Sequence, residues 1–173
     1  MLCGIVFAAA SLLSGSVYAQ GSPKQTATAV IGGKNITIAY SAPSVKGRKI
    51  FGNGGLVAKD PQAPIWRAGA NQATALTTDG DMMIGDVAVP AGKYTLFVDL
   101  KDSENWTLII SKETGQWGLA YKPANDLGRV KMKMSKPATP VEQLKYSISA
   151  AASKGIIQLE WENHVASVPV SVK

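Results

Sequence analysis

Hydrophobic and polar positions alternate with a period of two along most of the chain. The clearest stretch is 93–100, where Tyr94, Leu96, Val98 and Leu100 fall on one face. Alternation of this kind is typical of half-buried strands, and turn residues interrupt it at intervals of roughly 8–12 positions. The pattern predicts further strands over residues 26–31, 35–40, 65–67, 73–77, 82–84, 87–89, 106–111, 129–135, 144–148, 157–161 and 168–172.

No stretch shows the period of a capped helix, so the sequence predicts an all-β chain. Many short strands separated by turns favour two packed antiparallel sheets, and we expect a β-sandwich of about nine strands with a jelly-roll or Greek-key topology. Pro169 interrupts the last predicted strand. Because proline has no backbone N–H to donate to a neighbouring strand, this position predicts an edge strand.

The segment 41–64 interrupts the alternation. It contains three prolines and four glycines, too many for a regular element, although Ile50-Phe51 is compatible with one short strand. Loops of this length inside a compact domain are usually functional or poorly ordered. The segment is therefore predicted to be an irregular loop that is either functional or poorly ordered.

The first residues read as an export signal. Residues 2–13 are apolar or small, and Val17-Tyr18-Ala19 ends in the small residue that a signal peptidase requires. We expect a signal peptide at 1–19, a single β-sandwich domain at 20–173, and a periplasmic or secreted location. The only cysteine, Cys3, lies within the predicted signal peptide, and no later apolar run is long enough to predict a transmembrane span in the mature chain.

The chain is basic, with 18 Lys and Arg against 12 Asp and Glu and a formal charge of +6. This charge is compatible with an anionic partner. The basic residues are scattered singly, however, and no basic run alternates with aromatic residues in the way that nucleic-acid grooves do. We therefore expect no nucleic-acid partner, and the sequence leaves the oligomeric state open.

Two blocks carry a resemblance to a known family. Residues 38–52 read IAYSAPSVKGRKIFG and residues 65–71 read IWRAGAN. With these blocks the chain resembles the bacterial secreted family filed as domain of unknown function 2911. The likeness continues through VPAGKYTLF at 89–97, Trp106-Thr107, Asp126 with Arg129, and Trp161-Glu162. The resemblance implies an exported β-sandwich domain without an established activity. Gln72 departs from the pattern, because an acidic residue often follows Asn71 in the family.

Side chains in the two blocks could form a binding site. They offer cationic groups, hydroxyls, an amide and a flat aromatic face, which together suit a small anionic or carbohydrate ligand. The predicted ligand-binding residues are Tyr40, Ser41, Lys46, Arg48, Trp66, Arg67 and Asn71. The alternative is architectural: Arg67 is buried against a carboxylate such as Asp126 or Glu162, Trp66 fills the core, and the Gly-Ala-Asn segment turns the corner between strands.

Other chemistry finds little support in the residues. His164 is the only histidine, which excludes a site built from several imidazoles, and we predict no metal, cofactor or catalytic residue. A triad of Ser41, His164 and Asp126 lacks any supporting motif, and His164 lies in a predicted turn where a lone histidine is usually solvated. The carboxylates that could serve a hydrolase are dispersed: Asp99, Glu104, Asp126, Glu160 and Glu162.

Three hypotheses for the function follow. The first is a non-catalytic module that binds a ligand or glycan through one sheet and the loop 41–64. The second is a hydrolase of an extracytoplasmic substrate that uses carboxylates or His164, for which two carboxylates about 5–10 Å apart in a cleft would be the decisive feature. The third is a structural or assembly module whose sheet edge pairs with a partner.

Overall fold

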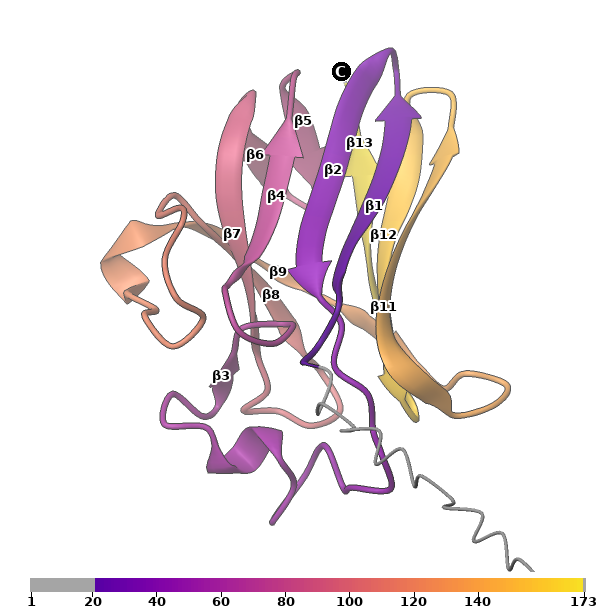
Figure 1. Ribbon diagram of the computed structural model, residues 1–173. Coiled ribbons are helices and arrows are strands. Elements are labelled where there is room, and N and C mark those ends of the chain that lie inside the picture. Colours follow the sequence, from indigo (N-terminus) through magenta and orange to yellow (C-terminus); the bar gives the residue numbers. More distant parts are fainter. Residues whose placement is uncertain (1–20, 173) are drawn as a thin grey trace, which may run out of the picture.

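The computed structural model describes residues 21–172, and the predicted signal peptide lies outside this part of the chain. Two antiparallel sheets of seven and six strands pack face to face (Figure 1). The prediction of an all-β sandwich is confirmed. In the described part of the chain no helix combines the length and the apolar character needed to cross a membrane.

The first sheet has the strand order β1-β2-β4-β7-β8-β9, with β3 paired to β7. Its first hairpin turns through Gly32 and Gly33, whose φ angles of 56° and 77° are the positive values that a tight turn between strands requires. The strand bounds are β1 Lys24–Ile31, β2 Lys34–Ser41, β3 Ile65–Trp66, β4 Thr74–Thr78, β7 Gly92–Asp99, β8 Thr107–Ser111 and β9 Asp126–Lys131.

The second sheet has the order β11-β12-β13-β5-β6, with β10 paired to β13. The chain enters this sheet after β4, forms β5 and β6, and returns to the first sheet as β7 beside β4. The bounds are β5 Met82–Ile84, β6 Val87–Val89, β10 Lys133–Ser135, β11 Val141–Ala151, β12 Lys154–Glu162 and β13 His164–Ser171. The total is 13 strands, above the predicted count of about nine, and four of them, β3, β5, β6 and β10, have only two or three residues.

The predicted single strand over 129–135 is wrong, because the chain changes sheets within it. β9 pairs with β8 in the first sheet and β10 pairs with β13 in the second. Between them, Met132 donates its backbone N–H to the carbonyl of Trp106 at 2.9 Å instead of joining either ladder. The alternation of side chains continues through this crossing, so the periodicity alone could not reveal it.

The predicted edge position of Pro169 is also wrong. β13 pairs with β12 on one side and with β10 and β5 on the other. On that second side, β10 pairs with residues 165–167 of β13 and β5 pairs with residues 170–171, so Pro169 lies between the two. Its carbonyl accepts the N–H of Gly85 at 2.8 Å. A residue in a strand directs its N–H and C=O to the same side. The missing donor therefore falls in a gap of the ladder, which is how a central strand accommodates the proline.

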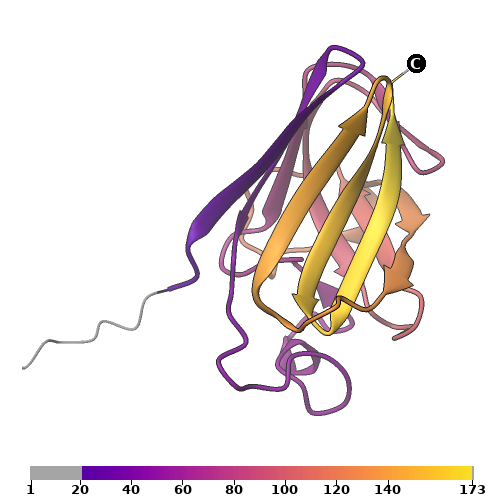
Figure 2. The same cartoon turned by 90° about the vertical axis from the view of Figure 1, so that its right-hand side faces the viewer.

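The loop 41–64 crosses one end of the sandwich, opposite the β1–β2 turn (Figure 1). The predicted strand at Ile50-Phe51 does not form; a 3₁₀ turn forms instead at Val57–Lys59. Buried Ile50, Phe51 and Val57 anchor the loop. Gly55 allows its close approach, since a Cβ there would lie 2.5 Å from the carbonyl oxygen of Ile50. The loop is therefore packed against the sandwich. Figure 2 shows the β12–β13 turn at the same end.

Candidate functional site

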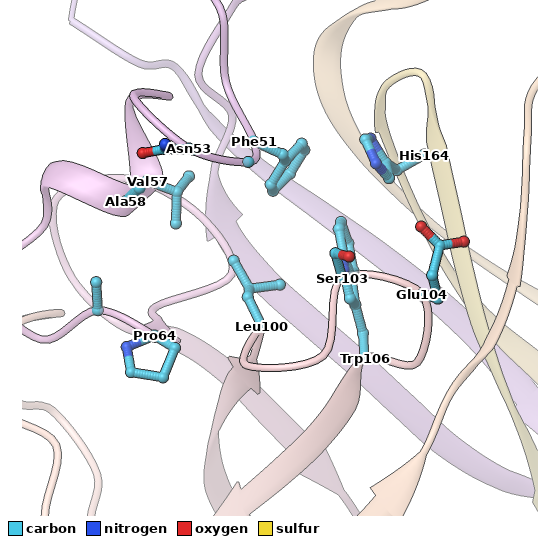
Figure 3. A pocket seen from close by; sticks show the side chains of 12 residues that line it. Phe51, Asn53, Val57, Ala58, Pro64, Leu100, Ser103, Glu104, Trp106 and His164 are labelled. Atoms are coloured by element: carbon cyan, nitrogen blue, oxygen red, sulfur yellow. The ribbon is translucent and has the colours of Figure 1, made fainter.

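An open pocket of about 550 Å³ lies between the loop and the end of the sandwich; we call it the loop-end pocket. Its lining comes from three separate parts of the chain: residues 51–53, 57–58 and 63–64 of the loop, residues 100, 103, 104 and 106 around the β7–β8 turn, and His164 at the start of β13 (Figure 3). The fold thus brings together segments that are far apart in sequence.

Aromatic rings form the inner wall of the pocket. The ring centroid of Phe51 lies 4.8 Å from that of Trp106 and 4.8 Å from that of His164. The imidazole stacks on the indole of Trp106 at 5.2 Å with an interplanar angle of 16°. These contacts hold the rings in one arrangement, so the wall is preorganised.

Two further tryptophans, Trp66 and Trp161, form a floor that supports this wall. Trp66 and Trp161 stack at 5.8 Å with an interplanar angle of 18°, and Phe51 packs edge-on against both. Both indoles are only 2% exposed. Trp66 therefore fills the core, as the architectural alternative predicted, and the rigid floor positions Phe51 at the pocket.

Glu162 holds His164 and the loop in place. The turn after Trp161 gives Glu162 a φ of 53°, and its Oε1 accepts the N–H of Ile50 at 3.1 Å. Its Oε2 lies 3.6 Å from Nδ1 of His164, too long for a hydrogen bond but close enough for electrostatic attraction. One carboxylate therefore ties the β12–β13 turn to the loop and faces the imidazole.

His164 is more enclosed than predicted. Its side chain is 31% exposed and stacks on Trp106, so the histidine expected to be solvated is solvated only in part. Burial lowers its pKa from the ordinary value of 6.5, and Lys136 acts in the same direction, against the opposing charges of Glu162 and Glu104. At neutral pH the imidazole is therefore neutral. Because Nδ1 is buried and faces a carboxylate, a proton on Nδ1 is favoured, and Nε2 is left as an acceptor.

The pocket has two unlike sides. Figure 3 shows His164 and Glu104 on one side and Val57, Ala58 and Pro64 on the other. Ser103 and Asn53 add further polar groups. Among the described residues, no lysine or arginine lines the pocket. The site thus combines an apolar surface with hydrogen-bond acceptors and one negative charge.

The model of the family described as "Protein of unknown function (DUF2911)" matches residues 22–170. The chain belongs to this family. No curated protein and no solved structure matches the chain. All residues that line the loop-end pocket lie inside the DUF2911 region.

Arg67, in one of the two blocks of the DUF2911 region, is engaged in an ion pair. Its Nη2 donates to Oδ2 of Asp60 at 2.7 Å, and the two side chains are only 15% and 11% exposed. Its Nη1 donates to the carbonyl of Asn71 at 3.4 Å. The architectural alternative, that Arg67 is buried against a carboxylate, is confirmed. The partner is Asp60 and neither of the two carboxylates given as examples; Asp126 binds Tyr121 and Arg129.

Lys46 and Arg48 lie on an exposed turn. The Nε of Arg48 donates to the carbonyl of Val45 at 3.0 Å, and its Nη2 donates to that of Ser44. The backbone N–H of Lys46 donates to Glu142 at 2.9 Å. The structure thus places these two cations apart from the loop-end pocket, which they do not line.

Tyr40 and Ser41 line a smaller hollow of about 260 Å³ together with Gln72. The hydroxyl of Tyr40 donates to Gln25 at 2.9 Å and accepts the N–H of Tyr146 at 3.1 Å. The seven predicted residues therefore do not share one cavity, although Arg67 and Asn71 are in contact. That any of them binds a ligand stays a prediction.

None of the seven predicted ligand-binding residues lines the loop-end pocket, although Glu104 and His164, which do, were named as candidates for a hydrolase. Phe51 and Trp106 stood within the family blocks, so part of the signal was present. Glu104 and Leu100 belong to a polar turn and a strand end that look ordinary in sequence. The triad of Ser41, His164 and Asp126 does not form, since His164 alone of the three lines this pocket.

Proposed function

We propose that this DUF2911 chain binds a small, largely apolar molecule in the loop-end pocket. The observation that carries the proposal is the open cavity of about 550 Å³ with a fixed aromatic wall. Natural small-molecule sites have volumes of roughly 300–1,000 Å³ and combine apolar walls with a few polar groups. This pocket has that size and that composition.

The rigidity of the walls supports binding. Phe51 is held by Trp66 and Trp161, and the N–H of Ile50 is held by Glu162. A preorganised site does not have to order its side chains when a ligand enters, so little affinity is lost to conformational entropy. The predicted role of the loop 41–64 is kept in this proposal, because the loop supplies the apolar side of the pocket.

The chemistry of the pocket argues against the small anionic ligand expected from the sequence. Glu104 lines the pocket, and no described lysine or arginine does. An anion would therefore meet repulsion without a compensating charge. A carbohydrate would leave many hydroxyls facing Val57, Pro64 and Leu100, which cannot form hydrogen bonds with them.

Phenylnaphthylamine, a neutral fluorescent probe, tests the proposal. We expect its fluorescence to rise when it binds the protein. Ala58→Trp places an indole in the pocket and should abolish the increase, whereas Ala138→Trp, at an exposed position outside the pocket, should leave it unchanged. Circular dichroism checks that both variants fold. No binding by the unmodified protein, or full binding by Ala58→Trp, would refute the proposal.

A hydrolase is the second candidate, favoured by the position of His164. Its Nδ1 lies 3.6 Å from Glu162, and Ser103 lines the same pocket as the imidazole. This is the arrangement of residue types that nucleophilic hydrolysis uses. Hydrolysis of short-chain nitrophenyl esters that is lost in both Ser103→Ala and His164→Gln would support it. Absence of turnover, or turnover that persists in both variants, would exclude this role.

Assembly through a sheet edge has less support. The edge strands β1 and β11 lie against each other: Gly32 donates its N–H to the carbonyl of Ala152 at 2.8 Å, and Gln25 donates to Gln143 at 2.9 Å. A partner strand would have to displace these contacts. The edges are therefore partly occupied within the chain itself.

We further propose that the chain is exported to the periplasm or secreted. The support is the apolar stretch 2–13 followed by Val17-Tyr18-Ala19. Expression with the native N-terminus in a bacterial host should yield a protein in the periplasmic fraction or the medium whose first residue is Gln20. A full-length protein in the cytoplasmic fraction would contradict this.

A further inference from the structure

The polar side of the loop-end pocket offers acceptors to a ligand. Glu104 is a carboxylate, which only accepts hydrogen bonds when ionised. In His164 the buried Nδ1 faces Glu162, so Nε2 is the nitrogen left to accept a hydrogen bond from a ligand. A ligand that satisfies both groups must bring N–H or O–H donors.

The charges around these acceptors are mainly negative. The charged groups that act on His164 are Glu162 from the end of β12, Glu104 from the β7–β8 turn, and Lys136 after β10. Two carboxylates thus stand against one ammonium group. Arg67 follows Trp66 in the sequence, and its positive charge is already neutralised by Asp60 at 2.7 Å. The field at the polar side therefore favours a positive charge on the ligand.

The aromatic wall adds to this preference. Phe51, Trp106 and His164 have ring centroids within 4.8–5.2 Å of one another, directly beside the acceptors. Aromatic rings attract a cation through their quadrupole, and the attraction grows where water is excluded. Carboxylates next to aromatic rings are a suitable environment for an ammonium group attached to an apolar body.

We propose that the loop-end pocket selects an organic amine, with its ammonium group bound between Glu104 and Nε2 of His164 and its apolar body against Val57, Pro64 and Leu100. This inference rests on the proposed small-molecule binding and names its ligand class. It follows from three features of the pocket: the acceptors, the local charge and the aromatic rings.

Three probes of matched shape test it: phenethylamine, phenethyl alcohol and hydrocinnamate, which are cationic, neutral and anionic. Each is titrated against bound phenylnaphthylamine. We expect the amine to bind at least tenfold more tightly than the alcohol, since a hydrogen bond between two charged groups is stronger than one from a neutral donor. Hydrocinnamate should bind most weakly. Equal affinity for the amine and the alcohol, or tighter binding of the carboxylate, would overturn the inference.

A pair of variants assigns the effect to Glu104. Glu104→Gln should weaken the amine roughly tenfold and leave the alcohol unchanged. Asp86→Asn removes one negative charge at an exposed turn outside the pocket and should change neither affinity. An equal loss in both variants would mean that only the net charge matters, which contradicts a local site. If phenylnaphthylamine binds but the amine shows no preference, small-molecule binding stands and the amine assignment fails; if nothing binds, both fail.

The pH dependence supplies a second readout. Protonation of His164 converts its Nε2 from an acceptor into a donor and adds a positive charge, so the affinity for the amine should fall as the pH drops below 6.5, the ordinary pKa that burial lowers here. The affinity for the alcohol should fall less. In His164→Gln the amine should bind more weakly at neutral pH, with a flatter profile. An amine profile identical to that of the unmodified protein would argue against contact with the imidazole.

Discussion

Arg67 and His164 are both nitrogen-bearing side chains that lie beside buried tryptophans and face a carboxylate, but only Arg67 has a completed ion pair. Arg67 donates to Asp60 at 2.7 Å, and both side chains are mostly buried. His164 lies 3.6 Å from Glu162, forms no hydrogen bond through Nδ1, and opens onto a cavity. The same loop contributes to both places, with Asp60 at one and Phe51 at the other.

The difference separates architecture from a binding site. A cation whose partner satisfies it has little left to offer a ligand, because a ligand would first have to break the existing pair. An imidazole with a free acceptor beside open apolar surface has that capacity. We therefore expect Arg67, the more conspicuous residue in the sequence, to be structural, and His164 to be the better candidate for function.

The largest expected effect comes from the floor that both regions share. Trp161 stacks on Trp66 and packs against Phe51. Trp161→Ala should lower the free energy of unfolding by about 3–5 kcal/mol, as for other large aromatic side chains removed from a core. Urea denaturation measures it. Trp117→Ala is the matched control, since that indole is 53% exposed and should cost less than about 0.5 kcal/mol. Similar costs for the two variants would contradict a rigid floor.

Arg67→Met tests whether the ion pair is structural. Methionine keeps the stem that packs on Gly118 but leaves Asp60 without its cation. The free energy of unfolding should fall by an amount between the ~1 kcal/mol expected for an exposed ion pair and the ~3–5 kcal/mol expected for a buried one. Binding of phenylnaphthylamine should be unchanged. The exposed Arg48→Met serves as control and should be nearly neutral. Loss of probe binding in a folded Arg67→Met protein would mean that Arg67 contributes to ligand binding after all.

A third cluster of charged and polar side chains can be compared with these two. It consists of Asp99, Tyr121, Asp126 and Arg129, which are joined by hydrogen bonds. Tyr121 donates its hydroxyl to Asp126 at 2.9 Å, and Nε of Arg129 donates to the same oxygen at 2.9 Å. Burial, followed by the bond to Asp126, raises the pKa of Tyr121 from 10.0 to about 12. We expect its phenol to ionise near that value.

Nuclear magnetic resonance of labelled tyrosine can follow this ionisation, with Tyr121→Phe identifying the signal among the five tyrosines. Asp126→Asn should lower the pKa of Tyr121, because it removes the negative charge that opposes ionisation. A pKa of Tyr121 near 10 in the unmodified protein would show that this network is open to water.

The strands could be predicted from the sequence because their signal is local. Alternation located β7, β8, β12 and β13, and it located even the short strands β5 and β6. It could not show that the chain changes sheets at Met132, nor that Pro169 faces a gap between β10 and β5. Both facts depend on which strands lie beside each other, and side-chain periodicity carries no information about neighbours.

The candidate site was harder to predict for the same reason. Its residues come from the loop at 51, the turn at 104–106 and the turn at 162–164. Each looks ordinary in its own segment: Glu104 resembles a solvated turn residue and His164 a solvated histidine. Arg67 attracted attention because it stands in a recognisable block, yet its partner Asp60 lies in the irregular loop, where no pattern identifies a pairing residue.

The smallest expected effect is the contribution of His164 to stability. Burial lowers its pKa in the folded protein below the ordinary value of 6.5. As the pH falls below 6.5, the unfolded chain therefore binds a proton before the folded one, and stability that is present above 6.5 is lost progressively until the pH has passed the folded pKa.

Other carboxylates titrate in an overlapping range, so the informative quantity is the difference between the unmodified protein and His164→Gln. Urea denaturation at a series of pH values measures it. As the pH falls, the free energy of unfolding should decrease more in the unmodified protein than in His164→Gln. Parallel curves would mean that the imidazole is as well hydrated in the folded chain as in the unfolded one. A gain in the unmodified protein at low pH would mean that Glu162 and Glu104 outweigh burial, and His164 would then be a paired cation like Arg67.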